Sequence, residues 1–301
     1  MSTPDDTPVA GADIPAATSA TPPDPPPVPE KKPSRAGRDL PAAVGSAVVL
    51  LAAIAASLFF WKPGFMLIVV AAVAVAVWEL GQAFSAREIT LVREPLMVGG
   101  VVMVLTAYVW GPPAMGTATA VTVLAAMLWR LRGGVAGYVR DVTATAFTTF
   151  YVPFLGSFVA LILAEPKGDL AIVTFIVVTI ASDIGGYAAG VLFGKHPMAP
   201  VISPKKSWEG FAGSTLFTVV AGWLLVDYLL DGDWWVGVLL GLVAVVTATL
   251  GDLCESVIKR DLGIKDMSQI IPGHGGLMDR LDSILATAAP TYLLLHYLAL
   301  R

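Results

Sequence analysis

Two polar segments interrupt this apolar chain. The carboxylates of the second segment are the side chains in the sequence that most clearly point to chemistry. This segment covers residues 251–282. If its two ends are helical, Asp252 and Glu255 share one face of the first helix, three residues apart. Asp279 and Asp282 share one face of the second helix in the same way. Mg²⁺ prefers oxygen ligands and is usually held by one or two carboxylates together with substrate phosphates, so converging carboxylates here would suit it.

The alternative for this segment is surface salt bridging between its acids and Lys259, Arg260 and Arg280. Asp252 favours a metal site over salt bridging. It follows an apolar run of membrane-spanning length, and placing a carboxylate so close to hydrocarbon is costly unless the carboxylate is functional. His274 stands among glycines, which let the backbone approach a phosphate closely while the imidazole donates to it or relays a proton. A lone histidine is more often structural.

The first polar segment, 194–210, combines basic and hydroxyl side chains. Lys205 and Lys206 lie between Ser203 and Ser207, immediately before a predicted helix. Such a segment suits a polyphosphate, since the lysines neutralise its charge while hydroxyls and free backbone N–H groups donate hydrogen bonds. The alternative is a plain cytoplasmic loop with an interfacial tryptophan.

The composition places these segments in a membrane protein. Of the 301 residues, 56% are hydrophobic and 14% charged, where soluble proteins average about a quarter charged. A net charge of -4 argues against a nucleic-acid partner, because binding a phosphate backbone needs clustered Lys and Arg. Cys254 is the only cysteine, which excludes an intramolecular disulfide and a multi-cysteine zinc site.

Membrane-spanning helices are predicted from apolar runs, since crossing about 30 Å of hydrocarbon takes roughly 20 residues. Nine such runs lie near 42–61, 64–84, 95–111, 114–130, 142–164, 169–193, 211–230, 234–251 and 283–300. The expected fold is an all-α integral membrane protein, a polytopic bundle of about nine transmembrane helices. Asp183 lies inside the sixth run, and an ionisable residue at such depth is by default a functional candidate facing the bundle interior.

The basic residues of the connections predict the orientation. They gather in alternate connections, at Lys31, Lys32, Arg35, Arg38, Arg87, Arg93, Arg130, Arg132, Arg140, Lys195, Lys205, Lys206, Lys259, Arg260, Lys265 and Arg280. Because Lys and Arg are enriched on the cytoplasmic side, the N-terminus and both polar segments are expected there, in a protein of the plasma membrane.

The chain is expected to have three parts. Residues 1–39 contain ten of the 22 prolines and no aromatic residue, which predicts a disordered cytoplasmic tail. N-terminal transmembrane helices follow over 40–140. The C-terminal catalytic region, with its cytoplasmic polar loops, covers 141–301.

The second polar segment also resembles a known family. Residues 256–282 read Ser-Val-Ile-Lys-Arg, four residues, Lys-Asp, five residues, then Pro-Gly-His-Gly-Gly-Leu-Met-Asp-Arg-Leu-Asp. This pattern resembles the signature of the phosphatidate cytidylyltransferases, and its many fixed polar positions make it highly specific.

Two further stretches, 202–210 and 183–190, are similar to the same family, so the resemblance covers roughly 141–301. Ile184 and Ser207 stand where the family often has threonine. Ser207 keeps the hydroxyl and Ile184 does not.

The resemblance implies an activity and its partners. The enzyme would transfer the cytidylyl group of CTP to phosphatidate, releasing pyrophosphate and giving CDP-diacylglycerol for phospholipid biosynthesis. CTP, phosphatidate and the lipid bilayer are then its partners, and a homo-oligomer is left open. The alternatives are a CTP-dependent lipid-alcohol kinase and, in another class, a membrane transporter whose path would use Asp183.

The resemblance also assigns roles. It implies a magnesium site on Asp252 and Asp279, with Glu255 and Asp282 as helpers and a second cation left open. Lys205, Lys206 and Arg280 are expected to clamp phosphates, with His274 as a further catalytic candidate. The expected substrate-binding residues are Ser203, Ser207, Lys259, Arg260 and Asp183.

Overall fold

The structure is a computed structural model that describes residue 49 and residues 52–270 and 275–300. All of these belong to one compact unit, 38–301. The predicted tail, the start of the first predicted span and His274 lie outside the described residues.

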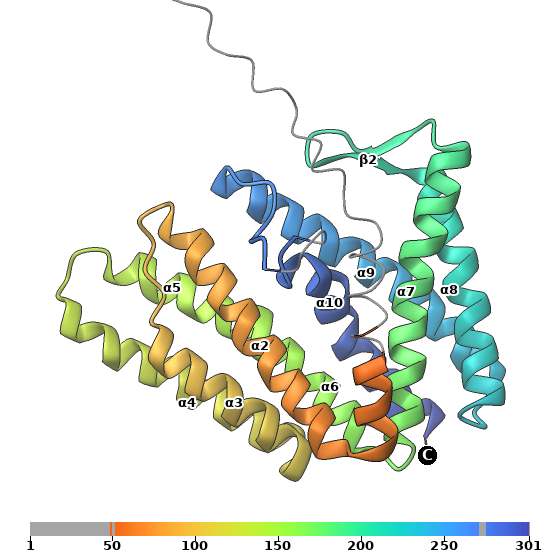
Figure 1. Cartoon of the computed structure of the whole chain (residues 1–301), viewed down its shortest axis with the longest axis horizontal. Helices are drawn as coiled ribbons and strands as arrows, with labels where there is room; N and C mark the ends of the chain where they lie inside the picture. The colour runs from red at the N-terminus through yellow and green to blue at the C-terminus, as the bar shows by residue number, and fades with distance from the viewer. Residues whose placement is uncertain (1–48, 50–51, 271–274, 301) are drawn as a thin grey trace, which may run out of the picture. The chain divides into compact units, whose positions relative to one another are not determined.

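Helices make up most of the described chain (Figure 1). After a helical stretch over 52–60, the elements are α2 Lys62–Ser85, α3 Arg93–Trp110, α4 Pro112–Arg130, the 3-10 turn η1 Leu131–Gly133, α5 Tyr138–Thr149, the π-helical turn η2 Phe150–Phe154, α6 Leu155–Ala164, α7 Gly168–Phe193, β1 Pro197–Ala199, β2 Ser203–Ser207, α8 Trp208–Tyr228, α9 Trp234–Leu262, α10 Met278–Leu294 and the π-helical turn η3 Leu295–Ala299. The predicted helical fold is confirmed.

Six described helices are long and apolar enough to cross a membrane: Lys62–Ser85, Pro112–Gly133, Tyr138–Ala164, Gly168–Phe193, Trp208–Leu229 and Trp234–Leu262. The third of these is a single helical run through η2. Pro153 explains the turn, because it has no N–H for the regular helical bond and its ring displaces the preceding turn.

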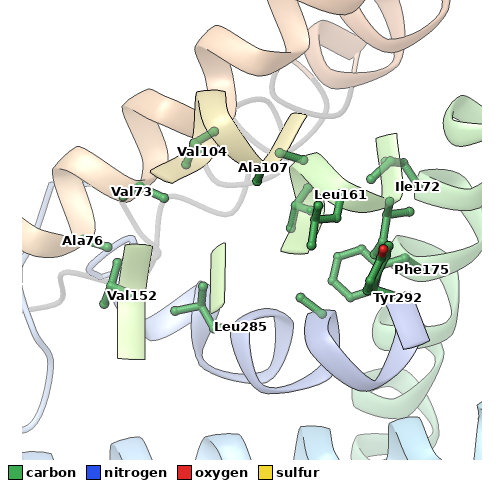
Figure 2. Close-up of a cluster of buried hydrophobic side chains, with 14 of the residues drawn as sticks. Val73, Ala76, Val104, Ala107, Val152, Leu161, Ile172, Phe175, Leu285 and Tyr292 are labelled. Carbon is green, nitrogen blue, oxygen red and sulfur yellow. The ribbon is translucent and has the colours of Figure 1, made fainter. Parts of the chain in front are cut away.

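The helices pack in two groups that α10 connects. α3 contacts α2, α4 and α6, while α8 contacts α7 and α9. α10 packs against both α9 and α6. Figure 2 shows the shared core, in which the labelled side chains are Val73, Ala76, Val104, Ala107, Val152, Leu161, Ile172, Phe175, Leu285 and Tyr292. The start of α10, with the predicted site residues, is thus anchored to the rest of the bundle.

Two features differ from the sequence-based expectation. The first polar segment forms an antiparallel hairpin, in which Pro197 pairs with Ser207 and Ala199 with Ser203. α9 does not end at the predicted membrane boundary near 251 but continues to Leu262. The helical ends assumed for the second polar segment are therefore present.

Candidate active site

A pocket of about 290 Å³ lies where α7, β2, α8 and α9 meet. Six predicted site residues line it: Asp183, Ser203, Lys205, Lys206, Ser207 and Asp252. They come from three stretches that are far apart in the sequence. The structure therefore brings the basic segment and the first carboxylate of the acidic segment to one place.

An ion pair between Lys206 and Asp252 crosses this pocket. The lysine Nζ lies 2.5 Å from Asp252 Oδ2 and donates a second hydrogen bond of 3.3 Å to the carbonyl oxygen of Thr249. Both side chains of the pair are only partly buried, so a ligand in the pocket can reach them. Asp183 lies within electrostatic range of Asp252, Lys206 and Arg280.

The hairpin that carries the lysines is fixed at both ends. Ser207 caps α8, since its Oγ accepts a 3.1 Å hydrogen bond from the Gly210 N–H. The Glu209 carboxylate accepts hydrogen bonds from the backbone N–H groups of Lys195 and His196 at 3.1 and 3.2 Å. Its other oxygen lies 2.5 Å from the His196 ring. Glu209 was not among the predicted site residues, although its place after the basic segment was a usable signal.

A second charged group lies at the facing ends of α9 and α10. Lys259 Nζ is 2.7 Å from Glu255 Oε2 and 2.8 Å from Asp279 Oδ1. These ion pairs are of the kind that the salt-bridge alternative expects, although Glu255 is buried and Asp279 nearly so rather than on the surface, and the ammonium of Lys259 is engaged by both carboxylates. Arg260 is exposed in the last turn of α9, and Arg280 is exposed in the first turn of α10.

A close approach of α9 and α10 places further acids beside the pocket. Gly251 permits it, because a Cβ there would stand 2.6 Å from the carbonyl oxygen of Asp282. Asp282 is buried and interacts electrostatically with Asp252 and Asp183. Three carboxylates from three helices thus act on one another across this region.

The acidic residues of the site differ in how well they suit Mg²⁺ as ligands. Among the described residues no group of three or more His, Cys, Asp or Glu is arranged to hold a metal. Asp252 suits the ion, because it lines the pocket and interacts electrostatically with Asp282 and Asp183. Glu255 suits it as well: the side chain is fully buried, and its Oε1 has no hydrogen-bond partner within the described chain, nor does the Tyr151 hydroxyl. Leaving a buried oxygen without a partner is costly, so the free Glu255 Oε1 suits a further ligand such as a cation, even though Lys259 already pairs with Oε2.

Asp279 fits less directly. Besides Lys259, its carboxylate accepts hydrogen bonds from the Met267 N–H at 3.0 Å and the Gly276 N–H at 2.9 Å. A carboxylate offers about four acceptor positions, so most of its capacity is used. A metal at Asp279 would have to replace one of these partners.

Glu79 on α2 is a residue that sequence reasoning missed. It is fully buried and accepts hydrogen bonds from the Leu277 N–H at 2.9 Å, the Met278 N–H at 2.6 Å and the Ser268 hydroxyl. These bonds satisfy donors at the start of α10, which has no side-chain cap of its own. A carboxylate inside an apolar run was the available signal, as it was for Asp183.

With this geometry in place, comparison with known proteins defines the class. The model of the cytidylyltransferase family matches residues 41–298 of the chain. The chain therefore belongs to this family, and the match includes the N-terminal helices.

Particular relatives carry a narrower name. A protein of Mycobacterium bovis named phosphatidate cytidylyltransferase is 41% identical over 283 residues, which cover 90% of this chain and 92% of that protein. A protein of the same name from Mycobacterium leprae is 39% identical over 284 residues, 89% of this chain and 91% of its own. One from Haemophilus influenzae is 36% identical over 165 residues, 52% of this chain and 57% of its own. The resemblance noted in the sequence is confirmed.

Proposed function

We propose that this chain transfers the cytidylyl group of CTP to the phosphate of phosphatidate, releasing pyrophosphate and forming CDP-diacylglycerol. The names of the relatives that match nearly the whole chain support this activity. The structural observation that carries it is the pocket in which Lys205 and Lys206 on β2 meet Asp252 on α9. It combines cations for a polyphosphate with a carboxylate for its metal ion.

The reaction needs positioning more than acid–base chemistry. A phosphate monoester is already anionic near neutral pH, so no strong base is required to form the nucleophile. The enzyme has to bring two anions together and stabilise charge on the departing pyrophosphate. Lys205 and Lys206 line the pocket from the hairpin, and Arg280 approaches from α10 within range of Asp183. We assign these three cations to the phosphates.

We assign Mg²⁺ to Asp252, with Asp282 and Glu255 as neighbours and Asp279 as a ligand that first gives up a present partner. When bound, the ion supplies positive charge to the phosphate oxygens. Lys259 lies between Glu255 and Asp279, so its proposed role is to hold these acids in place rather than to contact substrate. His274 and Arg260 remain candidates for phosphate contacts.

The membrane arrangement is part of the proposal. Nine spans with a cytoplasmic N-terminus would combine the six long apolar helices with the first helix, α3 and α10. The hairpin and the second polar segment would then face the cytosol, where CTP is found, and the plasma membrane would supply phosphatidate. A homo-oligomer is a separate expectation, which the mass of the detergent-solubilised particle tests.

The decisive assay uses purified full-length protein with labelled CTP, Mg²⁺ and either phosphatidate or a polyprenol. We expect a labelled CDP-lipid with phosphatidate and no phosphorylated alcohol with the polyprenol. Phosphorylated polyprenol would favour the kinase alternative, and solute uptake into proteoliposomes without CTP turnover would favour a transporter.

A matched pair of lysine variants ties the activity to the pocket. Lys206→Ala should lower the rate when CTP is well below saturation, since the side chain lines the pocket and pairs with Asp252. Lys167→Ala should keep the wild-type rate, because Lys167 pairs instead with Asp231 in the connection between α8 and α9, and neither residue lines the pocket. Equal activity in the two variants would separate the reaction from this pocket.

A further inference from the structure

A second pocket, of about 590 Å³, lies in the N-terminal half and shares no lining residue with the candidate active site. It is formed by the end of α2, the connection 89–92, the start of α3, the end of α4 with η1, and the start of α5. Three arginines line it, Arg93, Arg130 and Arg132. No step of the proposed reaction uses this pocket.

The walls of the pocket are held by buried contacts. Asp141, only 2% exposed, accepts hydrogen bonds from the Thr90 N–H at 3.1 Å and from Arg130 Nε at 3.0 Å. The Val92 N–H donates to Thr145 Oγ1 at 3.1 Å. The extended connection and the α4 end are therefore fixed before any ligand binds, which lowers the entropic cost of binding.

Arg93 is the cation best suited to a ligand. Its guanidinium lies over Gly81 of α2, where a Cβ would stand 3.0 Å from Nε and 3.3 Å from Nη2, so the glycine makes room for it. Arg130 is neutralised by Asp141, but no carboxylate in the described part of the chain forms an ion pair with Arg93 or Arg132. A half-buried guanidinium without a counter-ion attracts an anion, and its planar donors match a phosphate.

The surroundings indicate where that anion comes from. Trp129 is 42% exposed at the end of an apolar helix, and Arg132 stacks on its ring at 4.1 Å. Tryptophan at the end of a spanning helix is typical of the headgroup level of a bilayer. Basic pockets between spanning helices at this level bind the headgroups of anionic lipids.

We propose that this pocket, the Arg93 pocket, binds the phosphate group of an anionic phospholipid at the membrane surface, with Arg93 and Arg132 as the principal donors. Glu94 is exposed and is the one lining carboxylate that is not ion-paired within the described chain, so its negative charge should weaken anion binding. The bound lipid is distinct from the substrate in the candidate active site.

Lipid binding to the purified full-length protein tests this without any turnover. Dioctanoyl phosphatidylglycerol is titrated into the detergent-solubilised protein by calorimetry, with dioctanoyl phosphatidylcholine and inorganic phosphate as comparison probes. We expect saturable binding of phosphatidylglycerol only. Equal binding of phosphatidylcholine, or full displacement of phosphatidylglycerol by inorganic phosphate, would overturn the assignment to an anionic lipid.

Three variants locate the site. Arg93→Gln should weaken binding about tenfold or more, as expected for a charged hydrogen-bond donor. Arg140→Gln is the matched control: Arg140 is in the same region and pairs with Asp141 at 3.3 Å but does not line the pocket, so affinity should stay unchanged. Glu94→Gln should tighten binding, a gain that misfolding cannot produce. Wild-type affinity in both Arg93→Gln and Glu94→Gln would overturn the proposal.

Discussion

The charged side chains of the candidate active site are held by neighbours before substrate arrives. Lys206 is paired with Asp252, and Lys259 lies between Glu255 and Asp279. Such pairs fix the geometry of groups that must later bind anions and metal, and exchange of partners is then part of substrate binding. A substitution at any of these charged residues therefore removes both a group that would bind substrate or metal and a contact that holds its neighbour in place.

Asp279→Asn is expected to abolish turnover while expression and membrane insertion persist. The amide has nearly the same volume but loses the charge that pairs with Lys259 and would hold metal, and its NH₂ cannot accept the bonds that the second oxygen now accepts. Steady-state CDP-diacylglycerol formation at several Mg²⁺ concentrations measures the effect. Asp231→Asn, on an exposed acid paired with Lys167, is the control. Near-normal activity of Asp279→Asn at ordinary Mg²⁺ would contradict the metal assignment.

Lys205→Ala and Lys206→Ala are expected mainly to raise the KM for CTP. A hydrogen bond to a charged group is worth about 1.5–3 kcal/mol, so each loss should raise the KM roughly tenfold or more. Lys206→Ala should be the more severe, because Lys206 also neutralises Asp252 while Lys205 is exposed. Lys195→Ala, an exposed lysine before the hairpin, should leave CTP dependence unchanged. An unchanged KM in both pocket variants would favour the reading of this segment as a topological signal alone.

Among the helices, α10 combines residues of the candidate active site with structural contacts to several other helices. It begins with Asp279 and Asp282, packs on α9 and α6, and has its first N–H groups satisfied by Glu79 of α2. The N-terminal helices thereby hold a segment of the candidate active site. This agrees with a family match that extends from residue 41 rather than beginning near 141.

Glu79→Gln is expected to lower kcat more than it raises the KM for CTP. The amide keeps one acceptor oxygen but turns an NH₂ group toward a backbone donor, which loosens the start of α10 and with it Asp279. The matched control is Glu165→Gln, which alters a carboxylate paired with His296 beyond the other end of α10. Equal kinetics of the two variants would show that the contact of Glu79 is dispensable for catalysis.

For the whole molecule, the proline-rich tail is expected to be separable from catalysis. Removal of residues 1–30 should leave specific activity nearly intact, since this stretch is too poor in large apolar residues to form a core. Removal of 1–39 also deletes Lys31, Lys32, Arg35 and Arg38, so it should impair insertion more than chemistry. Activity per correctly inserted molecule compares the two truncations. A large loss with the shorter one would reveal a role for the tail.

The sequence by itself determined the features that depend on local composition and spacing. Runs of apolar residues identified the helices, because a helix in hydrocarbon satisfies its own backbone groups and needs only length and apolarity. The predicted runs from 64–84 to 283–300 agree with α2 to α10 within a few residues, apart from the extension of α9. The polar signature identified the family for the same reason, since its residues are close together in the chain.

Only the tertiary structure decided which distant residues meet. Three features depend on how the helices pack: the pairing of Lys206 with Asp252, the two hydrogen bonds that Glu79 accepts at the start of α10, and the engagement of Asp279 by Lys259 and backbone N–H groups. Helix periodicity shows which face a residue occupies but not which helix that face contacts. Packing between spanning helices depends on small residues and close approach rather than on a hydrophobic pattern. The sequence around each residue therefore does not predict which helix it contacts.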